Sequence, residues 1–395
     1  MPKTVILGAA RTPFGKMGGS LSTLDAPDLG GKAIGAALER AEVGADEVRH
    51  VVFGQVLQAG QGQIPSRQAQ IKGGIPKEVS SETVNKVCAS GLRAAGIIDS
   101  YVRAGDLDGP AVGGGMESMS QAPYLLTKAR FGFRMGDAKA LDAMVHDGLT
   151  NPFSGKQMFE EATEVGDELE MTRADMDKFA LRSHELAIKA TEEGRLPEEI
   201  VPVTISSKKG DTTVEIDEAP RADTNLESLS KLPPIFLEDG THTAGNAPGV
   251  NDGAGALVLS SDEWAAANGK QALATIVAQA AVADDFAYLA RTPAAATRKA
   301  LEKAGLKLED IDLFEINEAF ASVAINSMRT LGVDESKVNV NGGAIALGHP
   351  IGASGARILM TLVNELRRRG GGVGVAAICS GGGQGDAVIV EVNGA

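Results

Sequence analysis

Apolar residues occur along the chain in two kinds of segment, which together predict strands that alternate with helices. Short apolar runs bounded by glycine, proline or charged residues are typical of buried strands. Such runs include TVILGAA (4–10), VVFG (51–54), DGAGALVLSS (252–261), GVGVAAIC (372–379) and DAVIVEV (386–392). Helical spacing of apolar residues is clearest in ASGLRAAGIIDSYVRAG (89–105) and TRADMDKFALRSHELAIKATEEG (172–194). This alternation indicates an α/β fold built in layers.

The chain contains an internal repeat. ALERAEVGADEVRHVVFG (37–54) aligns without a gap with ALEKAGLKLEDIDLFEIN (300–317), and each copy has the pattern of a helix, a loop and a strand. ASGLR (89–93) aligns with ASGAR (353–357) in the same register to within one residue. Self-similarity that keeps one register predicts two copies of one α/β unit.

The first copy is interrupted by an insertion. GVGVAAIC runs through SGGGQG directly into DAVIVEV, whereas PAVGGGMES (110–118) meets a matching strand only at DGAGALVLSS. Long excursions from a compact unit are usually functional, so we predict a lid or binding domain there. The predicted division is an N-terminal half at 1–119 completed by 251–268, an inserted loop domain at 120–250 and a C-terminal half at 269–395.

Composition narrows the classes of function. The 395 residues include 38 Lys and Arg against 52 Asp and Glu, which gives a formal net charge of -14. That balance disfavours non-specific binding to nucleic acid or to an anionic membrane, because both need a basic surface. No apolar run is long enough to span a bilayer, so membrane insertion is not expected.

The chain has two cysteines, Cys88 and Cys379, which form no CxxC motif and no cluster with histidine. Neither a disulfide framework nor a metal site is therefore predicted. Two isolated thiols, and an N-terminal apolar run too short for a signal peptide, indicate a cytoplasmic location.

Cys88 lies in NKVCASGLRA (85–94), directly before a predicted helix. A lone cysteine is more often a small buried apolar residue than a nucleophile. At the N-terminal end of a helix, however, the partial positive charge and free N–H groups stabilise a thiolate, and they can also bind an oxyanion. This position makes Cys88 a candidate nucleophile.

His349 lies in ALGHPIGASG, in the loop that the repeat makes equivalent to the loop of Cys88. A glycine-rich loop at the end of a core strand is a common place for catalytic side chains. If the two copies pack about a pseudo-twofold axis, the two loops converge. The other histidines lack such a setting, so we expect structural roles for His50, His146, His184 and His242.

Two further strand ends carry candidate residues. Cys379 ends GVGVAAIC, and Asn317 and Glu318 follow the strand in FEINEAFA. Taken alone, Cys379 is a buried strand-end thiol and Asn317 a turn or cap residue. The glycines after Cys379 imply that the backbone there approaches something closely. The repeat places these strand ends at the same rim as the two loops, which predicts one site formed by all of them.

These segments resemble the motifs of the thiolase family, in the family's order and over nearly the whole chain. NKVCASGLRA resembles its acyl-cysteine motif, NEAFA its asparagine motif, NVNGGAIALGHPIGASGAR its histidine motif and CSGGGQG its second-cysteine motif. The resemblance is closest to the acetyl-CoA acetyltransferases, or acetoacetyl-CoA thiolases, and next to the longer-chain 3-ketoacyl-CoA thiolases of β-oxidation. It implies a duplicated, thiolase-like five-layered α/β/α/β/α fold with the insert in the first half.

The resemblance implies a reversible Claisen condensation of two acetyl-CoA to acetoacetyl-CoA and CoA through an acyl-cysteine. Cys88 would carry the acyl group, His349 would activate its thiol, and Cys379 would act as acid and base at the α-carbon. One oxyanion would be bound by His349 and a water held by Asn317, and the other by backbone N–H groups of Cys88 and Gly381. CoA thioesters would be substrates, with no permanently bound cofactor.

The resemblance also places CoA on the insert. Arg221 would lie near the nucleotide, Phe236, Ala244, Ala247 and Pro248 would line the pantetheine tunnel, and Leu149, Met158, Ala319 and Phe320 would shape the acyl end. Two positions depart from the family pattern, since Gln157 stands where histidine is common and Pro248 where serine is common. Proline has neither a hydroxyl nor an N–H, so position 248 loses a direct hydrogen bond to pantetheine.

Two other classes share part of this pattern. A condensing enzyme of the 3-ketoacyl synthase type also has a cysteine nucleophile on a duplicated α/β fold, but it needs no second catalytic cysteine. A non-catalytic acyl-CoA-binding relative would not need to retain all four reactive residues. The expected partners are acetyl-CoA, acetoacetyl-CoA or another 3-ketoacyl-CoA, and CoA, and the resemblance implies a homodimer or homotetramer. The pattern leaves chain length, physiological direction and branched substrates open.

Overall fold

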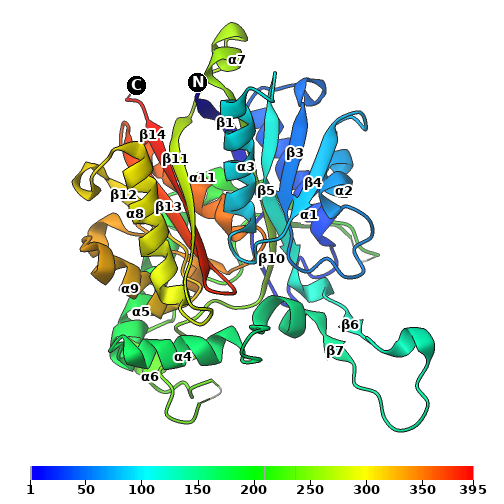
Figure 1. Cartoon of the computed structure of the whole chain (residues 1–395), viewed down its shortest axis with the longest axis vertical. Coiled ribbons are helices and arrows are strands. Elements are labelled where there is room, and N and C mark those ends of the chain that lie inside the picture. Colours follow the sequence, from blue (N-terminus) through cyan, green and yellow to red (C-terminus); the bar gives the residue numbers. More distant parts are fainter. Residues whose placement is uncertain (1, 209, 236, 395) are drawn as a thin grey trace.

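The computed structural model describes residues 2–208, 210–235 and 237–394 (Figure 1). Its main sheet has the strand order β12-β13-β14-β11-β1-β10-β5-β3-β4, and β2 pairs with β10 beside this path. The strands are β1 (Thr4–Arg11), β2 (Gly15–Lys16), β3 (His50–Gly54), β4 (Ser80–Val84), β5 (Ala111–Ser118), β10 (Asn251–Ser261), β11 (Ala274–Ala283), β12 (Leu313–Ile316), β13 (Gly372–Ser380) and β14 (Gln384–Val392).

The sheet consists of two halves with the same strand order. From the centre outward, the first half runs β1, β10, β5, β3 and β4, and the second runs β11, β14, β13 and β12. A bridge between Phe314 and Val338 extends the second half where β4 stands in the first. The halves join where β1 and β11 pair antiparallel, with Thr4 opposite Ile276. The strands predicted from the apolar runs are therefore found, and they occur as two matching sets.

Helices form three layers around these half-sheets. α3 (Ser90–Ala104) and α11 (Ser354–Arg368) pack against each other and against both half-sheets, so they form the middle layer. α1 (Ala26–Arg40) and α2 (Pro65–Lys72) cover the outer face of the first half, and α8 (Thr292–Ala304) with α9 (Ala321–Leu331) covers that of the second. The predicted five-layered α/β/α/β/α arrangement is confirmed.

The segment between β5 and β10 leaves the layered core. It contains an arm that extends away from the body in Figure 1, with β6 (Tyr124–Leu125) and β7 (Leu141–Asp142) paired at its base. The rest carries α4 (Met158–Glu168), α5 (Arg173–Glu192), β8 (Val203–Ile205), β9 (Thr212–Val214) and α6 (Leu226–Ser230). α5 confirms the helix predicted at 172–194. The remaining short helices include α7 (Asp262–Ala267) and α10 (Ala344–Leu347).

The topology brings the candidate residues to one rim. β12 and β13 are parallel neighbours, so Asn317 and Cys379 lie where both strands end. The middle-layer helices α3 and α11 are entered by the loops that carry Cys88 and His349. Within the described part of the chain, no helix is both long and apolar enough to cross a membrane.

Candidate active site

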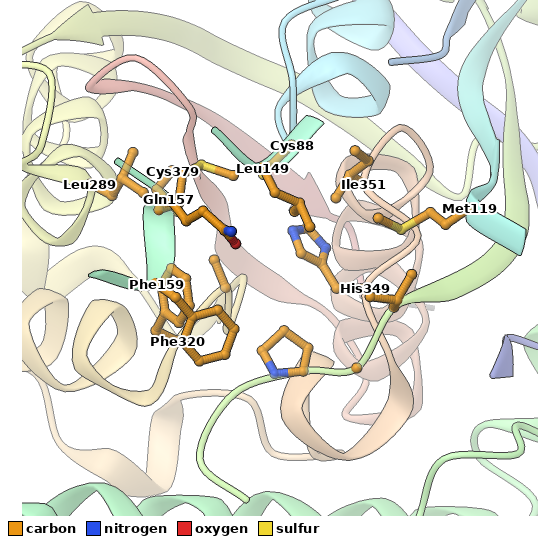
Figure 2. A pocket seen from close by; sticks show the side chains of 15 residues that line it. Cys88, Met119, Leu149, Gln157, Phe159, Leu289, Phe320, His349, Ile351 and Cys379 are labelled. Atoms are coloured by element: carbon orange, nitrogen blue, oxygen red, sulfur yellow. The ribbon is translucent and has the colours of Figure 1, made fainter. Parts of the chain in front are cut away.

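A cavity of about 80 Å³ lies where these strand ends meet the loops that precede α3 and α11. Figure 2 shows the side chains of Cys88, Cys379, Gln157 and His349 pointing toward the same space. Eight of the predicted residues line it: Cys88, Leu149, Met158, Pro248, Ala319, Phe320, His349 and Cys379. The two loops and the two strand ends therefore converge, as the internal repeat predicts.

Cys88 lies two residues before the first helical residue of α3 and is 3% exposed. The preceding residue, Val87, has φ 45°, a conformation that is strained for a β-branched side chain. Ser90 fixes this turn, because its hydroxyl accepts a hydrogen bond from the Lys86 N–H at 2.8 Å and donates to the Val87 carbonyl at 2.6 Å. The backbone is thus strained at the residue before the candidate nucleophile, where strain is often functional.

The thiol of Cys88 is protonated in the resting site. Burial raises the pKa of Cys88 to about 12, although hydrogen bonds from the backbone N–H groups of Gly381 and Cys88 oppose this rise. We expected the end of α3 to stabilise a thiolate, and that expectation is wrong for the free enzyme because desolvation outweighs the N–H groups. A base must take the proton as the sulfur attacks.

His349 is the side chain placed to take that proton. Its Nδ1 lies 2.6 Å from the hydroxyl oxygen of Ser354, and this hydroxyl donates to the carbonyl of Pro350 at 3.0 Å. Because the serine has a single proton, Nδ1 donates and Nε2 carries the free lone pair. Nε2 is buried and has no hydrogen-bond partner among the described residues. Burial and then the charge of Arg357 lower the pKa of His349 to about 3, so the ring is neutral.

Asn251 holds the backbone of the His349 loop in place. The His349 N–H donates to Oδ1 of Asn251 at 2.9 Å. Gly348 has φ 105°, and a Cβ there would lie 2.6 Å from the Asn251 side chain. Glycine is therefore required at 348 both by the backbone conformation and by the close approach of Asn251.

Cys379 and Asn317 complete the group at the strand ends. Cys379 is fully buried, and burial followed by the nearby Cys88 raises its pKa well above the usual range. The backbone N–H of Asn317 donates to the Ala377 carbonyl at 2.9 Å, which ties β12 to β13. Both side-chain polar atoms of Asn317 are buried and lack partners within the described ranges. Such a buried amide is available to bind a water or a substrate oxygen.

Two buried carboxylates accept backbone hydrogen bonds from the chain just before and just after His349. Glu117 accepts backbone hydrogen bonds from Val56 at 3.0 Å, Leu57 at 3.1 Å and Gly352 at 3.0 Å. These bonds connect the first half of the molecule to the loop of the second half. Burial raises the pKa of Glu117 to about 7, and the three N–H groups oppose that rise.

Glu318 is the second of these carboxylates. It accepts hydrogen bonds from the Ile345 N–H at 3.0 Å, the Ser183 hydroxyl at 2.7 Å and the Asn339 amide at 2.9 Å. It therefore links α10, which directly precedes the His349 loop, to α5 of the insert. The sequence predicted no role for Glu117, whose only signal is its place in PAVGGGMES, and predicted for Glu318 only a position at the rim.

The residues predicted to contact CoA do not all lie at this cavity. Ala247 is 3% exposed and packs behind the cavity with Met158 and Phe320, whereas Ala244 on the same loop is exposed. Arg221 lies at a separate cavity of about 190 Å³, where its backbone N–H donates to Nδ1 of His184 at 3.2 Å. Phe236 lies outside the described residues, and Gly381 lines a neighbouring groove rather than this cavity.

Several residues that line the cavity were not predicted: Met119, Phe159, Gly249, Val250, Leu289 and Ile351. Ile351 lies inside the quoted ALGHPIGASG segment and Met119 directly follows PAVGGGMES, so these segments were a usable signal. Leu289 belongs to no motif and reaches the cavity only because the chain turns back between β11 and α8.

His242 illustrates the structural role expected of the other histidines. Its ring nitrogens lie 2.9 Å from the Ser322 hydroxyl and 3.2 Å from the Thr163 hydroxyl, and burial lowers its pKa to about 4. It packs edge-on against Phe320. Across the residues that the structure describes, no three His, Cys, Asp or Glu side chains are grouped so that they could hold a metal ion.

Comparisons with known proteins agree with this geometry. The model of the thiolase N-terminal domain matches residues 4–263, and that of the thiolase C-terminal domain matches residues 270–392. An acetyl-CoA acetyltransferase of Syntrophomonas wolfei is 48% identical over 98% of this chain and 99% of its own. One from Shinella zoogloeoides is 47% identical over 98% of each chain. The crystal structure of the Bacillus anthracis acetyl-CoA acetyltransferase superposes with a TM-score of 0.97 at 40% identity, over 99% of both chains.

Proposed function

The chain belongs to the thiolase family and is an acyltransferase, and we propose that it works as an acetyl-CoA C-acetyltransferase through an acyl-enzyme on Cys88. This enzyme condenses two acetyl-CoA to acetoacetyl-CoA and CoA, and runs the thiolysis in reverse. The observation that carries the residue assignment is the convergence of two cysteines and the free Nε2 of His349 on one cavity. Retention of both cysteines favours this reaction over that of a 3-ketoacyl synthase or a non-catalytic relative.

The first step is acyl transfer to Cys88. Nε2 of His349 takes the thiol proton while the sulfur attacks the thioester carbonyl of acetyl-CoA, and the departing CoA sulfur receives the proton of Cys379, which becomes a thiolate. The oxyanion is bound by backbone N–H groups of Cys88 and Gly381, in line with the hydrogen bond from Gly381 to the Cys88 sulfur. Because both partners are neutral at rest, proton transfer and attack occur together.

The second step forms the carbon–carbon bond. Cys379, now a thiolate, removes a proton from the methyl group of a second acetyl-CoA, and the resulting enolate oxygen is bound by the protonated His349 and by a water held on Asn317. The carbanion attacks the acetyl carbonyl on Cys88, and collapse of the tetrahedral intermediate releases the Cys88 sulfur. Cys379 keeps the proton that it removed, and the Cys88 sulfur takes back the proton held on Nε2 of His349, which restores both thiols and the neutral ring. A thiol suits this role because its pKa lies nearer neutrality than that of a hydroxyl.

CoA binding is assigned to residues 120–250 together with the cavity mouth. Arg221 supplies positive charge for the nucleotide, and Ala244, Ala247 and Pro248 form the pantetheine wall. The amide of Gln157 provides a donor and an acceptor at a position where relatives commonly have histidine. CoA thioesters enter as substrates and leave as products, so the enzyme needs no permanently bound cofactor.

Two assays test this function. Acetyl-CoA alone should release CoA and yield acetoacetyl-CoA, and acetoacetyl-CoA with CoA should be cleaved. The Cys88→Ala variant is the matched control, because it removes the sulfur and changes little else. A protein that binds acetyl-CoA but catalyses neither reaction would be a binding relative, and one that condenses only with a carboxylated donor would be a synthase.

We also propose a cytoplasmic enzyme that assembles as a homodimer or homotetramer through the arm of the insert. Phe131 is 94% and Met135 97% exposed at the arm's tip, a large apolar exposure for a single chain. Light scattering of the full chain and of a variant with charged residues at 131 and 135 tests this. Loss of the larger assembly is expected, and an unchanged mass contradicts it.

A further inference from the structure

The oxyanion site proposed for acyl transfer is assembled from two segments that are far apart in the sequence. One N–H belongs to Cys88 in the first half, and the other belongs to Gly381, which follows β13 in the second half. The Gly381 N–H donates a hydrogen bond to the Cys88 sulfur, and a Cβ on Gly381 would lie 3.3 Å from the Val87 side chain. An oxyanion needs both donors at hydrogen-bond distance from one point. The site therefore depends on the contacts that fix the Gly381 backbone against the Cys88 loop.

The Gly381 backbone is poorly fixed by its own sequence. It lies in the turn that joins β13 to β14 (Figure 1), within a run of three glycines, Gly381, Gly382 and Gly383. Gly382 and Gly383 have φ 76° and 69°, which glycine adopts without strain. Because glycine has the greatest backbone freedom of any residue, this turn needs contacts from other segments to hold one N–H direction. One contact is at the far end of the turn, where the Asp284 N–H donates to the Gly383 carbonyl at 2.7 Å.

Lys86 makes the contacts at the near end of the turn. Its carbonyl accepts a hydrogen bond from the hydroxyl of Ser380, the residue directly before Gly381. Its ammonium group pairs with the carboxylate of Asp386 on β14. Ser380 and Asp386 belong to the two paired strands of one hairpin. Lys86 thus contacts both strands, on the two sides of the turn that presents Gly381.

Lys86 is itself fixed to the loop of the nucleophile. Its N–H donates to the Ser90 hydroxyl at 2.8 Å, and its carbonyl also accepts a hydrogen bond from the Ala89 N–H at 3.1 Å. Lys86 lies two residues before Cys88. A shift of the hairpin relative to Lys86 is therefore also a shift of Gly381 relative to the nucleophile.

The ion pair between Lys86 and Asp386 is shielded from solvent. The two side chains are 17% and 5% exposed, so water and salt screen the pair less than they screen a surface pair. Burial raises the pKa of Asp386, and the charges of Lys86 and Arg93 oppose this rise. Lys86 is the cation in direct contact with this buried carboxylate. Asp386 therefore fixes the position of the ammonium group and, through it, that of the loop.

We propose that Lys86, Asp386 and Ser380 form a clamp that sets the spacing of the two oxyanion N–H groups. This inference rests on the proposed function, because the clamp acts on the oxyanion of the acyl-transfer step. The three residues are positioning residues, since none of them is among the residues that line the reactive cavity. Their effect reaches the substrate through the backbone N–H groups. The enolate of the second step has a different binding site, so the clamp does not act on it.

The test compares two reactions of the same sulfur in the full-length enzyme. Acetylation of Cys88 by acetyl-CoA passes through an oxyanion, whereas alkylation by iodoacetamide displaces iodide and forms none. Both rates are measured on the Cys88 peptide by quenching, digestion and mass spectrometry. A clamp on the oxyanion N–H groups predicts variants that lose acetylation and keep alkylation. A general distortion of the loop would change both reactions.

The main variants break the ion pair from either side. Because deleting an oxyanion donor costs about 10²–10³ in rate, displacing one by Lys86→Met should slow acetylation of Cys88 about 10–10²-fold. Alkylation should change less than about threefold, since it forms no oxyanion. Asp386→Asn keeps the shape of the side chain and should give the same selective loss. Lys86→Arg keeps the charge and should restore most of the acetylation rate, and Ser380→Ala should give a smaller selective loss.

Lys72→Met is the matched control. It removes a lysine that pairs with Asp28 between α1 and α2, on the outer face of the first half. Neither acetylation nor alkylation of Cys88 should change in this variant. The same selective loss of acetylation in Lys72→Met would overturn the proposal.

Two further outcomes overturn the proposal. One is acetylation at the wild-type rate in both Lys86→Met and Asp386→Asn, and the other is an equal fall of acetylation and alkylation in these variants. If circular dichroism shows that Lys86→Met fails to fold, Asp386→Asn and Ser380→Ala provide the same comparison. A wild-type enzyme that is alkylated on Cys88 but never acetylated overturns the proposed function instead, so the two failures are distinguishable.

Discussion

The loop before α3 and the loop before α11 occupy equivalent places in the two halves, but they are held by different means. The Cys88 loop is short and strained, with φ 45° at Val87 and a hydroxyl of Ser90 that fixes the turn. The His349 loop has glycine at its tight turn and is held by the side chains of Glu117 and Asn251, both from the first half. Duplication thus supplies a symmetric frame, and local sequence gives one loop a nucleophile and the other a base.

Burial shifts the pKa values of Cys88 and His349 in opposite directions, and both shifts leave the group neutral. It raises the pKa of Cys88 to about 12 and lowers that of His349 to about 3, so both groups are neutral over the physiological range. Because of these two pKa shifts, Cys88 and His349 do not rest as a thiolate and an imidazolium. The free enzyme stores a protonated thiol beside an unprotonated base, and charge separates only during attack.

The largest expected effect follows from breaking the Cys88 side of the comparison. Cys88→Ala should abolish condensation and thiolysis, a loss on the order of 10⁶ in kcat by analogy with other nucleophile deletions. Thiolysis of acetoacetyl-CoA, monitored as the loss of substrate absorbance, measures this fall in kcat. Activity within a hundredfold of wild type would move the acyl group to another residue.

Replacing His349 should lower kcat less than replacing Cys88. His349→Ala keeps the nucleophile and removes the base and an oxyanion contact, so we expect a loss of about 10²–10⁴ in kcat. Rapid-quench measurement of acetyl-enzyme formation should show this step slowed. Ser354→Ala is the matched control, because it frees the ring without removing it, and it should retain more activity than His349→Ala.

The hydrogen bonds of Glu117 to the His349 loop allow a more specific test, with a smaller expected fall in kcat. Glu117→Gln keeps the shape of the side chain but turns an NH₂ group toward one of three backbone N–H donors, which destabilises the loop. We expect kcat to fall about tenfold, as for loss of roughly 1.4 kcal/mol, with KM nearly unchanged. Glu318→Gln, which weakens the hydrogen bond to α10 before the loop, should also lower kcat with KM nearly unchanged. A change in KM alone would assign both carboxylates to substrate binding.

The pH dependence of stability tests the effect of burial on the histidines without measuring catalysis. His349 and His242 have pKa values of about 3 and about 4 in the folded chain, below the unfolded value of about 6.5. As pH falls below 6.5 the unfolded chain takes up protons that the folded chain excludes, so the free energy of unfolding decreases. His242→Gln should reduce this loss between pH 7 and pH 5 by about 2 kcal/mol in urea titrations. An unchanged difference between the two pH values would show that His242 is protonated in the fold.

Much of this comparison was predictable from the sequence, because it depends on local patterns. The repeat register placed Cys88 and His349 in equivalent loops, and the apolar runs placed Asn317 and Cys379 at strand ends. The sequence did not predict the protonated state of Cys88, since desolvation depends on what the fold packs over the thiol. Nor did it predict the loop contacts of Glu117, which arise where distant segments meet.

The central claim is that two cysteines in one cavity have different roles, and one experiment tests it directly. Wild-type enzyme and Cys379→Ser are incubated with acetyl-CoA in deuterated water, trapped and digested, and mass spectrometry locates the acetyl group and measures deuterium in the acetyl-CoA methyl. We predict acetyl on Cys88 in both proteins, with methyl exchange slowed about 10²–10⁴-fold in Cys379→Ser because serine is far less acidic. Acetyl on Cys379, or near-normal exchange in Cys379→Ser, would contradict the account.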